Sequence, residues 1–243
     1  MGFKDHFSDV AGAYRQYRPR YPQALFRELA ARSPGVAWDS GCGSGQATEG
    51  LSRCFDHVYA TDPSMAQVSA APLFDNVTYL VASAEESTLS DASVDLAIAA
   101  QAVHWFDLPA FEREVRRVVK PGGLVVLLGY GLFESTPQID RIVREHYLTT
   151  LAPHWPKERL HIDRRYSDLT LAMPRLSLAD FAMEASWSVE QLLGYLGTWS
   201  AVHALATSTG RNLIAEIEPQ IRRCFNDERI GMRWSLIVHA YTR

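Results

Sequence analysis

The stretch Asp39-Ser-Gly-Cys-Gly-Ser-Gly45 constrains this chain more than any other part of its sequence. It follows the apolar run 35–39, which is typical of a buried strand, and precedes the helix-compatible stretch 46–55. Glycine lets the backbone turn sharply and lets a ligand approach it closely. In open α/β sheets, ligands bind at the carboxyl ends of the strands. The stretch, called the glycine loop below, therefore predicts a ligand site.

Apolar runs and helix-compatible stretches alternate through the first half of the chain. Strands are expected at 35–39, 57–61, 77–81, 94–99 and 124–128, and helices at 22–32, 46–55 and 108–120. Pro121-Gly122-Gly123 is expected to end the last of these helices and lead into a strand. Such alternation predicts a mostly parallel sheet with helices on both faces.

The second half of the chain has a different pattern. Its expected elements are helices at 139–151, 189–196 and 212–226, a loop-rich cover at 152–177, a weak strand at 181–187 and a closing strand at 232–242. The fold class is therefore α/β: a Rossmann-like, doubly wound, mostly parallel seven-stranded sheet, with helices on both faces and a helical cover.

The spacing of the glycines narrows the choice of ligand. They fall at 41, 43 and 45, whereas a dinucleotide fingerprint needs G-x-G-x-x-G and a P-loop needs Gly-Lys-Ser/Thr. Asp62 ends the second expected strand, 21 residues after Gly41, where a carboxylate can accept hydrogen bonds from both hydroxyls of a ribose. Ala84-Glu85 follows the third strand, where an adenine can lie along the backbone. Taken alone, a glycine loop is also compatible with a simple strand-to-helix turn.

With these motifs in order, the sequence resembles class I S-adenosylmethionine-dependent methyltransferases. The resemblance rests on DSGCGSG, ATDPS, SAEES, SVDLAIAAQAVHWFD and VVKPGGLVV, and covers roughly residues 10–130. More narrowly, YRQYRPRYP at 14–22, the AVHWFD run and LLGYLGTWSA at 192–201 resemble the trans-aconitate methyltransferase-like branch, whose members methylate small-molecule carboxylates.

The resemblance implies S-adenosylmethionine as cofactor and no metal. It also implies four parts: a lid and first helix (1–34), a cofactor-binding core (35–130), a substrate cover (131–210), and a final helix with the closing strand of the core sheet (211–243). The residues that it places around the cofactor are Tyr14, Arg18, Asp39, Gly41, Gly43, Gly45, Asp62, Pro63, Ser64, Ser83, Ala84, Glu85 and Gln101. Many relatives have Asp where this chain has Ser83, so Ser83 or Glu85 is expected to take the adenine amino group.

The substrate side is less specific. His104 lies past the fourth strand and is a candidate catalytic base, although a lone histidine there is also compatible with a structural role. Trp105, Tyr195 and Trp199 are candidate walls of the substrate pocket, and helix or core packing is the alternative for each. Arg15 and Arg20 are candidates for binding a carboxylate on the substrate, whereas the resemblance places Arg18 near the methionine carboxylate; the whole N-terminal segment is also compatible with a solvated arm.

Composition excludes several other classes. The net charge is −4 without a basic block, which argues against nucleic acid as a partner, and no stretch approaches the roughly 18 apolar residues of a membrane span. The three cysteines show no CxxC spacing and are expected to be reduced thiols in a cytoplasmic protein.

The expected function is methyl transfer to a small molecule, with O-methylation of a carboxylate favoured. Such a substrate is already ionised at neutral pH and needs no base. The alternatives are C-methylation of a quinone-like or carbon-acid substrate with His104 as base, an NAD-dependent oxidoreductase, which the glycine spacing disfavours, and a non-enzymatic S-adenosylmethionine-binding protein.

Overall fold

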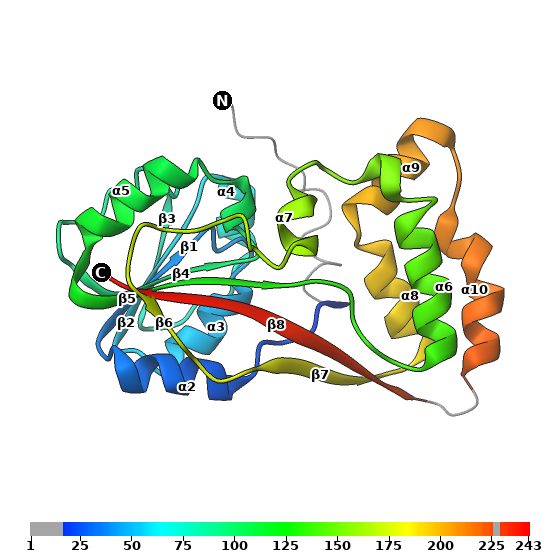
Figure 1. Ribbon diagram of the computed structural model, residues 1–243, viewed down its shortest axis with the longest axis horizontal. Helices are drawn as coiled ribbons and strands as arrows, with labels where there is room; N and C mark the ends of the chain where they lie inside the picture. The colour runs from blue at the N-terminus through cyan, green and yellow to red at the C-terminus, as the bar shows by residue number, and fades with distance from the viewer. Residues whose placement is uncertain (1–16, 226–228) are drawn as a thin grey trace.

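The computed structural model describes residues 17–225 and 229–243 (Figure 1). Its strands are β1 (Val36–Ser40), β2 (His57–Asp62), β3 (Val77–Val81), β4 (Val94–Ala100), β5 (Val119–Tyr130), β6 (Arg175–Leu176), β7 (Ala182–Trp187) and β8 (Ile230–Thr242). Its α-helices are α2 (Gln23–Arg32), α3 (Gln46–Ser52), α4 (Met65–Ala70), α5 (Leu108–Val118), α6 (Pro137–Leu148), α7 (Arg159–Asp163), α8 (Val189–Gly197), α9 (Ser200–Thr209) and α10 (Leu213–Cys224). Two single-turn 3-10 helices are η2 (Val103–Trp105) and η3 (Ala152–His154).

The strands form one sheet in the order β3-β2-β1-β4-β5-β8-β6, and β7 pairs with the far end of β8. Strands β1 to β5 are parallel to their neighbours, whereas β8 runs antiparallel to β5. This confirms the Rossmann-like, mostly parallel fold. The sheet has eight strands where seven were predicted, because the two-residue β6 also pairs with β8.

Both faces of the sheet are buried, which explains why its central strands are mostly apolar. Successive side chains of a strand point to opposite faces, so Ala37 packs with α2 and α3 while the adjacent Trp38 packs with α5. Figure 1 shows α2 and α3 below the sheet and α5 above it. The buried indole of Trp38 donates to Thr61 Oγ1 at 2.9 Å, so this polar group in the core is satisfied.

The structure corrects one boundary. Pro121-Gly122-Gly123 does not end α5, which stops at Val118; these residues lie inside β5, where the Gly122 amide donates to the Arg243 carbonyl at 2.9 Å. Helix α10 packs against α6 and α8. The shorter helices α4 and α7, and the ten-residue α9, were not predicted at all.

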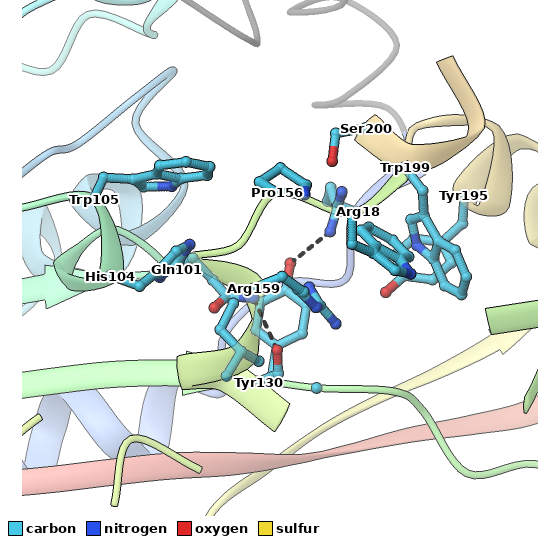
Figure 2. Close-up of a pocket in the computed structure, with 13 residues that line it drawn as sticks. Arg18, Gln101, His104, Trp105, Tyr130, Pro156, Arg159, Tyr195, Trp199 and Ser200 are labelled. Carbon is cyan, nitrogen blue, oxygen red and sulfur yellow. Dashed lines mark hydrogen bonds between the residues drawn. The ribbon is translucent and has the colours of Figure 1, made fainter. Parts of the chain in front are cut away.

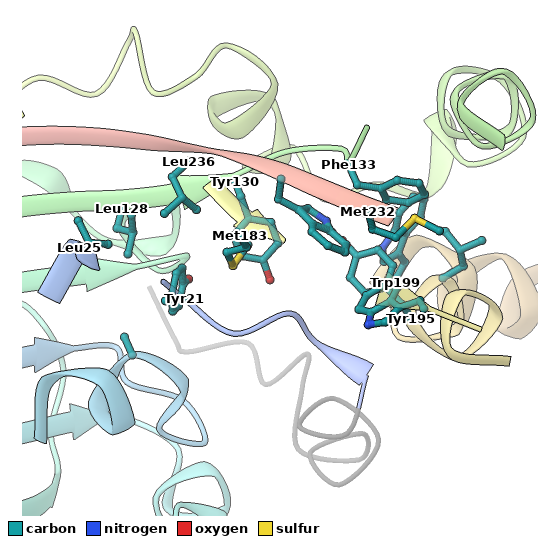
Figure 3. Packing of buried hydrophobic residues seen from close by; sticks show 14 of the residues in the cluster. Tyr21, Leu25, Leu128, Tyr130, Phe133, Met183, Tyr195, Trp199, Met232 and Leu236 are labelled. Carbon is teal, nitrogen blue, oxygen red and sulfur yellow. The ribbon is translucent and has the colours of Figure 1, made fainter. Parts of the chain in front are cut away.

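Helices α6, α8, α9 and α10 form a cap beside the sheet, and the long strand β8 runs from the sheet to this cap (Figure 1). The apolar core continues without interruption between them. Figure 3 shows it passing from Leu25 and Leu128 through Tyr130 to Tyr195 and Trp199. In the cap, the Trp234 indole donates to the Tyr195 hydroxyl at 3.1 Å. This packing holds the cap against the carboxyl edge of the sheet.

Candidate active site

The glycine loop connects β1 to α3 at the carboxyl edge of the sheet. The amides of Gly41 and Cys42 donate to the Thr61 carbonyl at 2.8 and 2.9 Å, which ties the loop to β2. Gly41 has a φ of 69°, and a Cβ there would lie 2.7 Å from the Cβ of Ala102, so only glycine fits. A Cβ on Gly43 would meet nothing nearer than 3.9 Å, so its backbone is open to a ligand.

Asp39 is completely buried at the end of β1. Its Oδ2 accepts a hydrogen bond from Thr48 Oγ1 at 2.6 Å, whereas Oδ1 has no partner in the described part of the chain. Burial, aided by the charge of Asp62, raises the pKa of Asp39 from its ordinary 3.8 to about 7. A buried carboxylate oxygen without a donor indicates a site that a cationic or N–H-bearing ligand would complete.

Asp62, at the end of β2, faces the glycine loop. Its Oδ2 accepts from the Gly43 amide and its Oδ1 from the Ser64 amide, both at 2.9 Å. Ser64 also caps α4, since its Oγ accepts from the Gln67 amide at 3.3 Å. A carboxylate has about four acceptor positions, so Asp62 can accept from ligand hydroxyls as well. Pro63 lies between Asp62 and Ser64, where the chain leaves the strand.

The residues after β3 hold a compact turn. Ser83 bridges to Glu86, and its Oγ accepts from the Glu86 amide at 3.2 Å. Ala84, next in the chain, is buried. The Oε1 of Glu85 accepts from the Asp107 amide at 2.9 Å, which ties this turn to the start of α5.

Gln101 follows β4 in a strained conformation, with a φ of 53° that is uncommon for a residue with a side chain. Its amide nitrogens are satisfied, because the backbone N donates to the Leu128 carbonyl at 2.8 Å and Nε2 to the Tyr130 carbonyl at 2.9 Å. Its Oε1, however, is buried without a partner among the described residues. Gln101 is thus a second buried acceptor at this edge of the sheet.

A pocket of about 600 Å³, part of it open to solvent, lies between this edge and the cap. Figure 2 shows its lining residues, which come from the strand ends, the stretch 152–177, the cap and, for Arg18, the segment before α2. The residues predicted from the sequence that line it are Arg18, Gln101, His104, Trp105, Tyr195 and Trp199. The structure therefore brings together His104, Trp105, Tyr195 and Trp199, the candidates for catalysis and for the pocket walls.

Two arginines give the pocket its charge. Arg18 donates from Nη1 to the Tyr130 hydroxyl at 3.2 Å, and its guanidinium lies 5.1 Å from the centre of the Tyr195 ring. Arg159, on α7, lies 5.1 Å from the Trp155 ring centre and donates to the Tyr147 hydroxyl at 2.9 Å. Arginine stacked on aromatic rings is well suited to bind an anion. The described lining contains two arginines and no carboxylate, and outside the lining Asp163 Oδ1 lies 3.7 Å from Arg159 Nε.

His104 lies at the Trp105 side of the pocket and is almost fully buried (Figure 2). Burial, with smaller contributions from the charges of Arg159 and His161, lowers its pKa from 6.5 to about 3. The imidazole is therefore neutral at pH 7 and a poor proton acceptor. Its Nδ1 lies 3.1 Å from the Tyr166 hydroxyl.

Two of the predicted residues, Tyr14 and Arg15, are outside the described residues. Arg20 does not line the pocket; it is largely exposed and pairs with Glu49 at 3.4 Å. Conversely, Arg159 and Tyr130 line the pocket although the sequence did not single them out. Arg159 carries no local motif and only the fold brings it to the site. Tyr130 ends β5 beside β4, two residues after the end of the predicted strand 124–128.

Two further features concern metals and membranes. Within residues 17–225 and 229–243, no group of three or more His, Cys, Asp or Glu side chains is arranged to hold a metal ion. None of the helices in those ranges has the length and apolar character that a membrane crossing requires.

A mostly parallel sheet, a glycine loop after β1 and an acidic residue closing β2 define an α/β protein that binds a ribose-containing ligand at its carboxyl edge. Comparison with known proteins shows which family of such proteins the chain belongs to. Residues 38–127 match the model of the methyltransferase domain family. A Dictyostelium discoideum protein named as a methyltransferase is 32% identical over 92% of this chain and 87% of its own length.

Two further relatives agree. The solved structure of a protein named as a type II methyltransferase, from Anaeromyxobacter dehalogenans, is 44% identical and superposes with a TM-score of 0.87, covering 93% of this chain and 98% of that one. A malonyl-[acyl-carrier protein] O-methyltransferase of Dechloromonas aromatica is 36% identical over 63% of this chain and 57% of its own length. The chain belongs to the class I S-adenosylmethionine-dependent methyltransferases, and S-adenosylmethionine is its methyl donor.

Proposed function

We propose that this methyltransferase transfers the methyl group to an oxygen of a small carboxylate. The observation that carries the proposal is the pocket charge: Arg18 and Arg159 converge from distant parts of the chain on an aromatic-walled pocket without a carboxylate in its described lining. We assign the acceptor carboxylate to Arg159, because a guanidinium binds a carboxylate through paired, charge-assisted hydrogen bonds. Arg18 remains assigned to the cofactor. The aromatic rings of Trp155, Trp199 and Tyr195 suit the apolar part of such a small molecule.

The cofactor fits the residues at the carboxyl edge. We assign the methionine ammonium to the two unpartnered acceptors, Asp39 Oδ1 and Gln101 Oε1, and the ribose hydroxyls to Asp62. The open backbone at Gly43 allows close approach. The remaining contacts follow from the family resemblance: Gly41 and Gly45 shape the loop, Arg18 and Tyr14 face the methionine carboxylate, and Pro63, Ser64, Ser83, Ala84, Glu85 border the adenine.

The chemistry asks little of the protein beyond positioning. S-adenosylmethionine supplies an activated methyl group on a sulfonium, and an ionised carboxylate attacks it without losing a proton. This agrees with the neutral state of His104, whose lowered pKa of about 3 makes it a weak base. C-methylation, which would need His104 to remove a proton, is disfavoured for the same reason. The relative named malonyl-[acyl-carrier protein] O-methyltransferase adds support for O-methylation.

The remaining parts of the proposal concern partner and location. A pocket between the sheet edge and the cap suits a small-molecule acceptor, and neither the net charge of −4 nor the composition favours nucleic acid. Cys42, Cys54 and Cys224 are free thiols, which fits a reducing, cytoplasmic location.

A methyl-transfer screen tests the function. The purified protein is incubated with labelled S-adenosylmethionine and panels of small mono- and dicarboxylic acids, phenols and quinone precursors, and the products are identified by mass spectrometry. We expect methyl esters of one or more acids. Methylated phenols or carbon-methylated quinone precursors, with acids unreacted, would overturn the carboxylate assignment.

A matched pair of variants tests the anion site. Arg159→Gln should raise KM for the acid at least about tenfold with a smaller change in kcat, because a charge-assisted hydrogen bond to the ground state is lost. Arg164→Gln is the control: Arg164 is exposed and pairs with Asp168 at 3.0 Å. Equal KM values for the two variants would remove Arg159 from the substrate site.

A further inference from the structure

His104 and Tyr166 form a buried pair beneath the pocket. The Tyr166 hydroxyl lies 3.1 Å from His104 Nδ1, and Tyr166 itself is completely buried. A histidine and a tyrosine can bond in two ways, with the proton on Nδ1 or on the hydroxyl. With the proton on Nδ1, the other ring nitrogen, Nε2, is a hydrogen-bond acceptor; with the proton on the Tyr166 hydroxyl donating to Nδ1, Nε2 carries a hydrogen and is a donor. The two arrangements therefore differ in what His104 offers to a ligand.

The hydroxyl hydrogen decides between them. If Nδ1 carried the proton, the hydrogen of the Tyr166 hydroxyl would need another acceptor, and His104 Nδ1 is the one hydrogen-bond partner of that oxygen in the described parts of the chain. A buried hydroxyl left without an acceptor is costly. The favoured arrangement therefore has Tyr166 donating to Nδ1, so that the proton of the neutral imidazole resides on Nε2.

Tyr166 is held rigidly enough to enforce this choice. Its ring packs against Gly129, where an added Cβ would lie 2.7 Å from Cε2 and 2.8 Å from the hydroxyl oxygen. Arg165 and Tyr166 both have positive φ, 54° and 56°, a conformation that side-chain residues adopt only when their surroundings impose it. The Tyr166 amide also donates to the His161 carbonyl at 2.7 Å. The hydroxyl is thus fixed under His104.

The electrostatic surroundings keep both groups uncharged. Burial lowers the pKa of His104 and raises that of Tyr166. The charges of Arg159 and His161 lower the pKa of His104 further, because they oppose a second proton on its imidazole. Because His104 lines the pocket while its Nδ1 is turned to Tyr166, Nε2 is the nitrogen left for a ligand. Nε2–H is a hydrogen-bond donor, on the same pocket as the Arg159 guanidinium.

We propose that Tyr166 is a positioning residue that fixes His104 in its Nε2–H form, and that His104 donates this hydrogen to an oxygen of the methyl acceptor. The second half rests on the proposed function. A carboxylate has one oxygen that attacks the methyl group and a second that can accept from His104, so the pair would orient the acid for in-line transfer. It would also select against acceptors that present an N–H group at this position, because two donors would then face each other.

Nitrogen-15 NMR of the histidine-labelled protein tests the first half without any substrate. In the wild-type protein at pH 7 we expect His104 Nδ1 to resonate as an unprotonated nitrogen and Nε2 as a protonated one. The His104→Gln variant assigns these signals, because they disappear from its spectrum. In Tyr166→Phe the two nitrogens should shift toward each other as both tautomers become populated. A protonated Nδ1 in the wild-type protein would overturn the assignment.

Kinetics on the acceptor found by the methyl-transfer screen test the second half. Glutamine places an amide donor near the position of Nε2, so His104→Gln should retain most of kcat/KM, while His104→Ala should lose about tenfold. Tyr166→Phe, which keeps the ring against Gly129, should lose about three- to tenfold in kcat/KM while its thermal unfolding temperature falls by no more than about ten degrees and the protein stays folded at the assay temperature.

Two outcomes would count against the proposal. If His104→Gln and His104→Ala both lose a hundredfold or more, His104 acts as a base and not as a donor. If Tyr166→Phe leaves kcat/KM unchanged, Tyr166 positions nothing. Failure of the proposed function is a separate result: the screen would then yield no methyl ester, while the NMR experiment would still report the tautomer.

Discussion

Replacing Asp39 by Asn tests the buried acid of the cofactor site. Asp39 is fully buried, Thr48 donates to one of its oxygens at 2.6 Å, and the other oxygen has no partner among the described residues. In the absence of cofactor, ionising this group costs free energy, which is why its pKa rises to about 7. Asn keeps the shape and the hydrogen bond from Thr48 but cannot ionise.

The sign and size of the effect follow from proton linkage. Between pH 4 and pH 7 the unfolded Asp39 is ionised while the folded one still holds its proton, so folded-state stability falls as pH rises through this window. From pH 5 to pH 8 the raised pKa of Asp39 lowers the unfolding free energy of the wild-type protein by about 3 kcal/mol. Asp39→Asn should lack this loss. The unfolding free energy of the variant minus that of wild type should therefore be more positive at pH 8 than at pH 5.

Urea unfolding of the ligand-free protein at pH 5 and pH 8 measures the difference. Subtracting the change in Asp39→Asn from that in wild type removes all groups that titrate equally in both. The control is Asp75→Asn, at an exposed aspartate, which should follow wild type. With S-adenosylhomocysteine, wild-type affinity should rise from pH 5 to pH 8 as Asp39 ionises opposite the ammonium, and the variant should show no such rise. Equal pH dependence of unfolding in wild type and Asp39→Asn would refute the reasoning.

Three further outcomes are expected. Asp62→Ala should weaken S-adenosylhomocysteine binding by about 1–3 kcal/mol in calorimetry, because a buried acceptor is lost; unchanged affinity, or tighter binding of NAD, would contradict the assignment. Gly50→Ala should lower the unfolding free energy measured in urea by about 1–3 kcal/mol, since the added Cβ would lie 2.0 Å from Phe26 Cε2. This loss should outweigh the higher helix propensity of alanine, which is worth about 1 kcal/mol. A stabilised variant would show that α2 and α3 move apart without cost. Burial and two neighbouring carboxylates raise the pKa of Cys42, so native alkylation at pH 8, read by mass spectrometry, should modify the more exposed Cys224 first; early modification of Cys42 would show that its loop opens.

The sequence predicted the cofactor half of the site because its residues are local to strand ends. Asp39 and Asp62 each close a strand of a regular α/β alternation, and parallel strands bring their carboxyl ends to one edge. Spacing along the chain is then enough to predict proximity in space. The substrate half lacks such a rule, because Arg159 comes from the short helix α7, inside a cover that shows neither strand nor helix periodicity.

The error at the end of α5 has a similar origin. Pro121-Gly122-Gly123 carries the turn residues that usually follow a helix, but the partner that keeps these residues in a strand is Arg243, at the opposite end of the chain. Helix α10 is amphipathic, which predicts a helix but not the surface that buries its apolar face. In both cases a contact between residues far apart in the sequence overrides or completes the local signal.

The charges on the two sides of the carboxyl edge are opposite, and this arrangement suits the proposed reaction. Asp39 and Asp62 face the cofactor side, whereas Arg18 and Arg159 line the acceptor pocket. An anionic acceptor is thereby drawn to the positive side, next to the donor. Transfer of the methyl group turns the carboxylate into a neutral ester, which can no longer form an ion pair with the Arg159 guanidinium. Arg159 therefore binds the ester less tightly than the acid, so the same residue favours substrate binding and product release.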